Sequence, residues 1–330
     1  MMHGTVVMTA PELAPEAVTL LTDAGLAIVY MRPFPSAGEV ADVVRKHQAV
    51  AVICRQGRVN GAVMDASAGL KIIARHGVGM DEVDLDAARA RGLLVCRAPG
   101  SNSVAVAEHT IALVLALAKD ILPLAASVAQ GGWRAPGAQL RDIAGLRLGL
   151  VGFGPIGQRV ARMAMALGME VAATHPSGTE QGAGAASRDP DHVPRLAFDG
   201  LLARSDVVSL HCPLLPHTQG MIDARALGLL PPGALLVNTA RGGLLDEVAV
   251  TRALDSGQLG GAALDVFIDE PPAPDHPLRR HRRVICTPHV AGVTASSMRA
   301  MGMMAAQCVI AALAGTAIPP ERVVVPAGIA

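Results

Sequence analysis

Aromatic residues are almost missing from this chain of 330 residues, which has four Phe, one Tyr and one Trp. A core with so few large rings has to be filled by small aliphatic side chains, and hydrophobic residues make up 51% of the chain. Small side chains allow helices to pack closely against a sheet. The length exceeds that of one typical hydrophobic core, and we therefore expect two domains.

Excess charge of either sign is also missing, because Lys and Arg total 28 and Asp and Glu total 28. Nucleic-acid binding needs clustered positive charge, so we expect no nucleic-acid partner. The apolar run at 110–118 has about half the length of a membrane span. We therefore interpret it as part of a core helix and expect no membrane partner.

Cysteine is present but not clustered. The five residues are Cys54, Cys96, Cys212, Cys286 and Cys308. They form no CxxC pair and no Cys/His cluster, so we expect no metal site and interpret them as small buried side chains in a reducing compartment. The N-terminal segment has neither a basic stretch nor a long apolar one. We therefore expect no signal peptide and a cytoplasmic location.

Short apolar segments alternate with helical ones along the chain. The strand-like segments are 6–10, 27–30, 49–54, 71–77 and 93–99, and then 146–152, 170–174, 207–211, 234–239, 262–267 and 284–289. The segments expected to be helical are 11–25, 83–92, 103–120, 158–168 and 297–315. This alternation predicts two parallel sheets covered by helices, and the continuous apolar runs of the second series favour strands buried on both faces. Residues 175–195, rich in Gly, Ser and Pro, are interpreted as a surface loop.

A glycine-rich turn directly follows the first strand of the second series. It reads Gly152-Phe153-Gly154-Pro155-Ile156-Gly157 and precedes the helix expected at 158–168. In this setting the first glycine permits the turn, the second lets a pyrophosphate approach the backbone, and the third lets the helix pack on the strand. The helix N-terminus favours negative charge. The turn therefore predicts dinucleotide binding.

One part of the dinucleotide fingerprint is missing. About twenty residues further on, an Asp or Glu normally binds the adenosine ribose, but the strand at 170–174 runs into His175, with no carboxylate there. Without that carboxylate a 2′-phosphate is not repelled. NAD and NADP therefore both remain open as cofactors, and we include His175 in the cofactor site.

Three polar residues follow apolar strands near the end of the chain: Arg241, Glu270 and His289. A histidine can give and take a proton near neutral pH, a carboxylate can orient its ring, and an arginine can bind a carboxylate with two parallel hydrogen bonds. Taken singly, each has an ordinary structural explanation: a structural histidine, an arginine paired with Asp246, or a turn carboxylate. Together they predict a site for reducing a small keto acid.

The chain resembles the family of D-isomer-specific 2-hydroxyacid dehydrogenases. The motifs that carry the resemblance are RHGVGMDEVDLDAARARG (75–92), VAEHT (106–110), LGLVGFGPIGQRVA (148–161), HCPLLPHTQGMI (211–222), LLVNTARGGLLDE (235–247), ALDVFIDEPP (263–272) and TPHVAG (287–292). The resemblance implies an α/β fold with two Rossmann-like, doubly wound parallel-sheet domains. These would be a flavodoxin-like substrate domain (1–100 plus 297–330) and an NAD(P)-binding Rossmann domain (101–296). It also implies a homodimer, for which the apolar helix at 103–120 is a candidate interface.

The resemblance also implies roles for individual residues. Arg241 would bind substrate, Glu270 would be the partner of the histidine, and His289 would be the acid/base. The other implied contacts are the backbone of Val78 and Gly79 with the substrate carboxylate, and Thr239, Ala240 and Asp265 with the cofactor, Asp265 at its nicotinamide end. Arg55 or Arg58, after an early strand, is a candidate contact for a second anionic group such as a phosphate, and the alternative is that both are solvated loop residues.

The expected activity is hydride transfer between the nicotinamide C4 and the C2 of a small 2-keto acid such as hydroxypyruvate or glyoxylate. D-3-phosphoglycerate dehydrogenase is an alternative, although we expect no regulatory domain in this chain. Another is a dinucleotide-sensing protein similar to the C-terminal-binding corepressors, because such relatives can retain the Arg, Glu and His.

Overall fold

The computed structural model describes residues 3–133, 140–175 and 192–328, and it divides into two compact units. The first unit consists of Met1–Asn102 and Val293–Ala330, and the second of Ser103–Gly292. The sequence places these boundaries at 100/101 and 296/297, a few residues away. Most of the loop expected at 175–195 lies outside the described residues.

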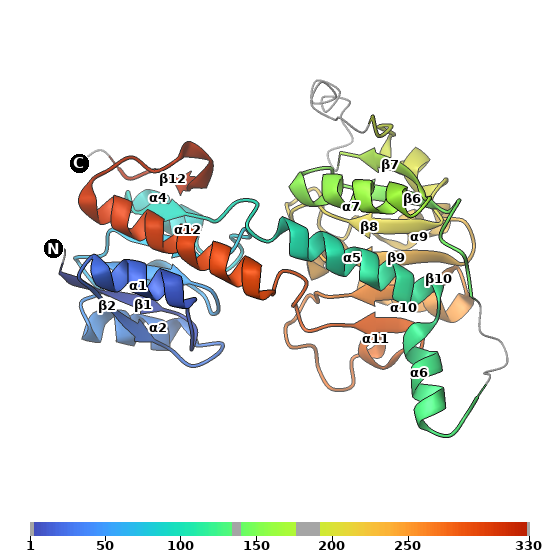
Figure 1. The fold of residues 1–330 in the computed structure, drawn as a ribbon, viewed down its shortest axis with the longest axis horizontal. Helices are drawn as coiled ribbons and strands as arrows, with labels where there is room; N and C mark the ends of the chain where they lie inside the picture. Colours follow the sequence, from blue (N-terminus) through green and yellow to red (C-terminus); the bar gives the residue numbers. More distant parts are fainter. Residues whose placement is uncertain (1–2, 134–139, 176–191, 329–330) are drawn as a thin grey trace. The chain divides into compact units, whose positions relative to one another are not determined.

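A six-stranded sheet forms the centre of the first unit (Figure 1). Its order is β12-β5-β4-β3-β1-β2, parallel throughout except for β12, which pairs antiparallel with β5. The strands are β1 (Gly4–Met8), β2 (Leu26–Tyr30), β3 (Ala51–Cys54), β4 (Ile72–Arg75), β5 (Leu94–Cys96) and β12 (Val323–Val325). Without β12 this is the 2-1-3-4-5 order of flavodoxin-like folds, which confirms the fold class expected for this part of the chain.

Helices cover both faces of this first sheet. They are α1 (Pro15–Asp23), α2 (Ala37–Lys46), α3 (Gly61–Met64), α4 (Leu85–Ala90) and α12 (Ala295–Ala314). Neighbouring residues of one strand enter opposite cores: Val7 packs on the side of α2, and Val6 packs on the side of α1 and α12. This is the alternation of a strand buried on both faces. By length and hydropathy α12 could cross a membrane, but here it packs against α1 and the sheet.

The second unit contains a parallel sheet with the order β11-β10-β9-β8-β6-β7. The strands are β6 (Arg147–Val151), β7 (Glu170–Thr174), β8 (Val207–Leu210), β9 (Ala234–Asn238), β10 (Leu259–Leu264) and β11 (Val284–Cys286). A single parallel bridge between Ala173 and Arg195 continues the sheet beyond β7. The direction of winding reverses between β6 and β8, and open α/β sheets bind ligands at such a switch point.

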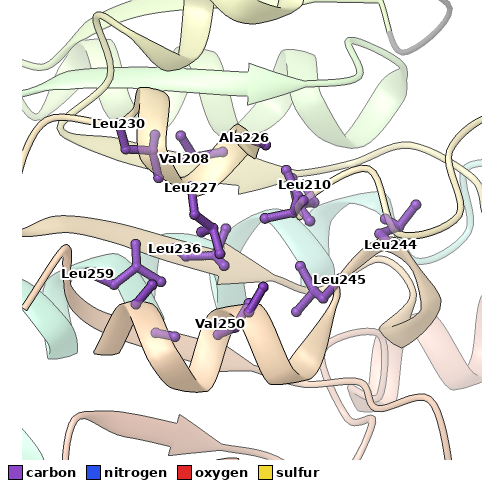
Figure 2. Packing of buried hydrophobic residues seen from close by; sticks show 14 of the residues in the cluster. Val208, Leu210, Ala226, Leu227, Leu230, Leu236, Leu244, Leu245, Val250 and Leu259 are labelled. Carbon is purple, nitrogen blue, oxygen red and sulfur yellow. The ribbon is translucent and has the colours of Figure 1, made fainter. Parts of the chain in front are cut away.

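Two cores lie on the two faces of the second sheet. Figure 2 shows the one beneath α8 (Phe198–Leu202), α9 (Ala224–Leu229) and α10 (Glu247–Ser256), where Leu236 meets Leu227 and Val250. The neighbouring Leu235 and Val237 point into the other core, which is covered by α5 (Ser103–Ala118) and α7 (Pro155–Ala166). The structure thus confirms a second doubly wound α/β domain.

The helix α6 (Ile121–Ala129) was not expected from the sequence. It follows α5 after a 63° bend, and none of its residues is buried. In contrast, α5 packs along α7 and the sheet of its own unit. Much of α5 is thus buried within its own unit, the subunit interface expected there stays a prediction, and half-exposed apolar residues lie on α6.

Candidate active site

His289 and Glu270 form a hydrogen-bonded pair at the carboxyl edge of the second sheet. His289 lies three residues beyond β11, and its Nδ1 is 2.7 Å from Oε2 of Glu270. The side chains of the two residues are 48% and 35% exposed, respectively, so the pair is accessible to a small molecule. Such a short contact is typical of a hydrogen bond with a charged partner.

The turn that carries His289 is held by the buried carboxylate of Asp265. Oδ1 of Asp265 accepts hydrogen bonds from the Thr287 hydroxyl (2.5 Å) and the Val290 N–H (2.9 Å), and Oδ2 accepts one from the Ala291 N–H (2.8 Å). His289 itself has a φ of +55°. This left-handed backbone costs a residue with a side chain about 1–2 kcal/mol, which the three bonds to Asp265 offset.

Glu270 is fixed by the loop that follows β10. Its Oε1 accepts the Phe267 N–H at 3.0 Å, which leaves Oε2 for His289. The same loop is held from α10, because Oε1 of Glu247 accepts the Ile268 N–H at 3.3 Å. A side chain at Gly242 would overlap the Phe267 backbone, so this close approach requires glycine.

Arg241 follows β9 and lies close enough to influence the pair electrostatically. Its carbonyl accepts a hydrogen bond from Nδ2 of Asn238 (2.8 Å), and its Nη1 donates to the Ala240 carbonyl (2.6 Å). The charge of the guanidinium lowers the pKa of both Glu270 and His289. The structure therefore brings together the three residues that the sequence singled out.

The pair is poised to hold a proton on the histidine. The hydrogen bond to Glu270 raises the pKa of His289 above its usual value, against opposing effects of burial and of Arg241. Burial favours the neutral form of Glu270, but the hydrogen bond and charge of His289 outweigh it, and the pKa of Glu270 is lowered. The two shifts agree with an ion pair that is stable near neutral pH.

The glycine-rich turn has the geometry of a phosphate site. Gly152 has a φ of +99° and packs on the backbone of His211, leaving no space for a side chain. Gly154 precedes α7, and within the described residues no atom lies within 4 Å of the place where its side chain would stand. Gly157 is buried and faces the Gly152 carbonyl, and Pro155 and Ile156 form the first turn of α7. A pyrophosphate can therefore reach the backbone at Gly154 and the helix N-terminus.

Other residues expected at the cofactor surround this turn. His175 is exposed directly after β7. The guanidinium of Arg195 lies over the Phe153 ring at 3.7 Å from its centroid, a contact that the sequence did not suggest. The Thr239 hydroxyl is 3.0 Å from that of Thr110 on α5. Asp265 holds the His289 turn, and the nicotinamide contact expected for it stays a prediction.

The remaining predicted residues lie in the first unit, at the carboxyl edge of its sheet. Arg75 connects them, because its Nη1 donates to the Arg55 carbonyl (2.6 Å) and its Nε to the Gly79 carbonyl (2.8 Å). The Arg55 side chain is 18% exposed and contacts Glu12 at 3.5 Å. Among the described residues, the N–H groups of Val78 and Gly79 have no acceptor.

The residues that sequence reasoning missed support others rather than face a ligand. Asn238, Glu247 and Arg75 each hold the backbone near a predicted residue, and the Thr287 hydroxyl donates to the carboxylate of Asp265. Their positions were the available signal: Asn238 and Arg75 end a strand, Thr287 directly follows one, and Glu247 begins α10. Among the described residues, no group of His, Cys, Asp and Glu could hold a metal ion.

The comparisons with known proteins agree with this geometry. A family model for the NAD binding domain of D-isomer specific 2-hydroxyacid dehydrogenases matches residues 111–291. The D-3-phosphoglycerate dehydrogenase of Archaeoglobus fulgidus is 36% identical over 304 residues, which cover 92% of this chain and 56% of that protein. The hydroxypyruvate reductase of Thermotoga maritima is 36% identical over 258 residues, or 77% of this chain and 81% of that protein.

One solved structure is similar to almost the whole length of this chain. The TT0316 protein from Thermus thermophilus has a TM-score of 0.87 at 38% identity, and the match covers 97% of this chain and 100% of that one. The chain spans about half the length of the phosphoglycerate dehydrogenases that it matches.

Proposed function

Because the chain belongs to the family of D-isomer-specific 2-hydroxyacid dehydrogenases, we propose that it interconverts a small 2-keto acid and the corresponding 2-hydroxy acid. The observation that carries this proposal is the His289–Glu270 pair, 2.7 Å apart, with the charge of Arg241 acting on both. A proton donor and a binding site for an anion are the two elements that keto-acid reduction requires of the protein.

A nicotinamide dinucleotide is the cofactor, and the residues present fit it. The open position at Gly154 and the start of α7 would hold the pyrophosphate, and His175 would lie toward the adenosine ribose. Thr239, Ala240 and Asp265 follow the neighbouring strands and would surround the nicotinamide end. When bound, the dinucleotide supplies or accepts the hydride of the reaction.

His289 acts as the general acid in reduction and as the general base in oxidation. The oxygen of the keto group becomes an alkoxide when hydride reaches the carbon, and the protonated Nε2 of His289 donates a proton to it. Glu270 accepts a hydrogen bond from Nδ1 and so directs Nε2 outward. Its negative charge also keeps the ring protonated until the transfer occurs.

Each unit holds, by itself, a feature that suits an acidic substrate. Arg241 presents a planar guanidinium that can bind carboxylate or keto oxygen with two hydrogen bonds, which a lysine cannot copy. The N–H groups of Val78 and Gly79, which have no acceptor in the described part of the chain, suit the substrate carboxylate. Arg55 is the candidate contact for a second anionic group.

The substrates we favour are hydroxypyruvate, glyoxylate or a similar small keto acid. D-3-phosphoglycerate is the alternative, because Arg55 retains an exposed fraction of 18% and lies at the same edge of the first sheet as Val78 and Gly79. Its weak contact with Glu12, at 3.5 Å, would be easily exchanged for a phosphate. The two alternatives differ in whether the substrate carries a second anionic group.

A spectrophotometric screen tests the proposal. Oxidation of NADH and of NADPH is followed with glyoxylate, hydroxypyruvate, pyruvate and phosphohydroxypyruvate as substrates. We expect turnover with at least one unphosphorylated keto acid. Turnover with phosphohydroxypyruvate alone would favour the alternative, and Arg55→Gln would then abolish it. Dinucleotide binding without any turnover would refute the proposed enzymatic activity and would support a role as a dinucleotide sensor.

We also propose that the chain forms a homodimer through α6. Ile121, Leu122 and Val128 are about half exposed on this one helix, and exposed apolar residues that gather on one element are typical of interaction surfaces. In a symmetric dimer the same surface of a second copy would bury these side chains. Light scattering after size-exclusion chromatography should give a dimer mass, and Leu122→Glu should give a monomer. A monomeric wild-type protein would refute this interface.

A further inference from the structure

The first half of α5 reaches the ends of three neighbouring strands of the second sheet. The Thr110 hydroxyl on this helix is 3.0 Å from that of Thr239, which follows β9. In the preceding residue, His109, Nε2 is 3.2 Å from the hydroxyl of Thr287, which follows β11. The same nitrogen is 3.9 Å from Oδ1 of Asp265, which follows β10. Two consecutive residues of one helix therefore contact the segments after β9, β10 and β11.

Each of these three segments carries one of the predicted catalytic residues. Arg241 lies in the segment after β9, Glu270 in that after β10, and His289 in that after β11. The helix itself is well supported, because α5 packs on β9, β10 and α7. The chain also enters the second unit at Ser103, where α5 begins, and leaves it at Gly292, shortly after His289. A bond between α5 and the His289 segment thus joins the two ends of this unit.

The hydrogen bonds that start at His109 run in one direction. A hydroxyl has a single proton to donate, and Thr287 donates its proton to Oδ1 of Asp265 at 2.5 Å. The Thr287 oxygen can therefore only accept from His109, and this requires a proton on Nε2 of that ring. The ring is thus held in a form with Nε2–H, whether or not Nδ1 also carries a proton.

The bond from α5 supports the carboxylate that holds the His289 turn. The Asp265 side chain is 1% exposed and binds this turn on both sides of His289, through the Thr287 hydroxyl before it and the Val290 N–H after it. Without the donor from α5, the part-buried Thr287 oxygen loses its hydrogen bond and the hydroxyl can turn away from the carboxylate. A displacement of about 1 Å in a reacting group can lower a rate by about 10²-fold. Proton transfer by His289 therefore depends on this bond.

We propose that His109 is a positioning residue for the proton transfer by His289. It donates from α5 to Thr287, Thr287 donates to Asp265, and the carboxylate keeps the turn in the conformation that gives His289 its positive φ. The proposal rests on the proposed reduction of a keto acid, because His109 acts in it only through His289. Its contribution should therefore appear in the rate of the chemical step rather than in the binding of either ligand.

Steady-state kinetics of two variants of the full chain test this role. His109→Leu removes the donor, whereas His109→Gln keeps an N–H group at the end of a side chain of similar length. With the keto acid that the wild type reduces, we expect kcat to fall by about tenfold or more in His109→Leu and to stay within about threefold in His109→Gln. KM for the keto acid and Kd for the dinucleotide should stay within about twofold in both variants.

Three outcomes would overturn the proposal: wild-type kcat in His109→Leu, equal losses of kcat in the two variants, or a rise of KM or Kd at constant kcat. Lys119→Met is the matched control. It removes another hydrogen bond beside α5, from Nζ of Lys119 to Asp142 at 2.7 Å, which lies at the end of the helix away from His109. Its kcat should equal that of the wild type, because neither segment carries a predicted catalytic residue.

Amide hydrogen exchange tests the same link without turnover. The N–H groups of Val290 and Ala291 are bound to Asp265. They should exchange about tenfold faster in His109→Leu than in the wild type, and at nearly the wild-type rate in His109→Gln. Unchanged exchange in His109→Leu would overturn the role of His109 even if the wild type is an active reductase. A wild type that reduces no keto acid would instead refute the proposed function, whatever the exchange rates are.

Discussion

The two units place different chemistry at equivalent points of similar sheets. In the second unit β6 is followed by Gly152, whose backbone packs on that of His211 after the neighbouring strand β8. In the first unit β1 is followed by Thr9, whose hydroxyl accepts the N–H groups of Arg55 and Gln56 after the neighbouring strand β3. In the first sheet the side chain of Thr9 fills this position, and in the second sheet the backbone of Gly152 occupies it.

This difference explains why one sheet is suited to phosphate and the other is not. The segment from β1 to α1 (9–14) contains no glycine. The segment from β6 to α7 leaves open space at Gly154 before a helix of twelve residues. Strand order is nearly shared by the two units, so the ligand is determined by the turn rather than by the fold.

The largest effect should come from removing the acid. His289→Gln keeps a hydrogen-bonding side chain of similar size but cannot transfer the proton, so we expect kcat of reduction to fall by about 10²–10⁴-fold. Affinity for the dinucleotide, measured by fluorescence titration, should stay nearly unchanged, because the glycine-rich turn is not altered. Wild-type turnover in this variant would remove His289 from the mechanism.

The next effect should follow from filling the open position of the second unit. Gly154→Ala adds a methyl group where no described atom lies within 4 Å, so the protein should unfold at nearly the wild-type temperature. The methyl group would occupy the space that the pyrophosphate needs, and we expect the dinucleotide Kd to rise about tenfold or more. Unchanged affinity would show that the phosphate does not approach this turn.

The matching change in the first unit should lower the stability and leave the dinucleotide Kd unchanged. Thr9→Val keeps the shape of a fully buried side chain but removes the acceptor of two backbone N–H groups. We expect a loss of about 1–3 kcal/mol in the free energy of unfolding, measured in denaturant, with the dinucleotide Kd unchanged. A variant as stable as the wild type would show that Thr9 does not hold the strand ends together.

A pH profile tests the pair in the second unit. Reduction needs protonated His289, whose pKa Glu270 raises, so kcat/KM should remain high above the usual histidine pKa and fall as pH rises through the raised value. Glu270→Gln should move this fall to lower pH. The direction is fixed by the sign of the interaction: losing a carboxylate weakens the protonated form. If the fall of kcat/KM occurs at the same pH in Glu270→Gln, a group other than His289 causes it.

The sequence was sufficient to predict the two sheets and the polar residues at their carboxyl edges. Strands buried on both faces leave continuous apolar runs, and Arg241, Glu270 and His289 each follow such a run. It was insufficient for α6, a short helix that buries no side chain, and for β12, whose three residues pair antiparallel with β5 at the edge of the sheet.

The supporting hydrogen bonds could not be predicted for a related reason. The family resemblance implies a cofactor contact for Asp265, and the structure adds that its carboxylate is bound to a turn some twenty residues later. Which backbone groups a buried carboxylate meets depends on the tertiary packing of both segments, and no local pattern in the sequence records it.

The smallest effect should come from the end of β7, where the second sheet lacks the usual carboxylate. His175 is exposed at that position, where the sequence has no Asp or Glu to repel a 2′-phosphate. His175→Asp should repel the 2′-phosphate and accept the ribose hydroxyls, so the ratio of kcat/KM for NADH to that for NADPH should rise by several-fold. His175→Asn is the matched control, because it has a similar shape without the charge. If both variants change the ratio equally, shape rather than charge selects the cofactor. If neither does, selection resides elsewhere, and the guanidinium of Arg195 over Phe153 is the next candidate.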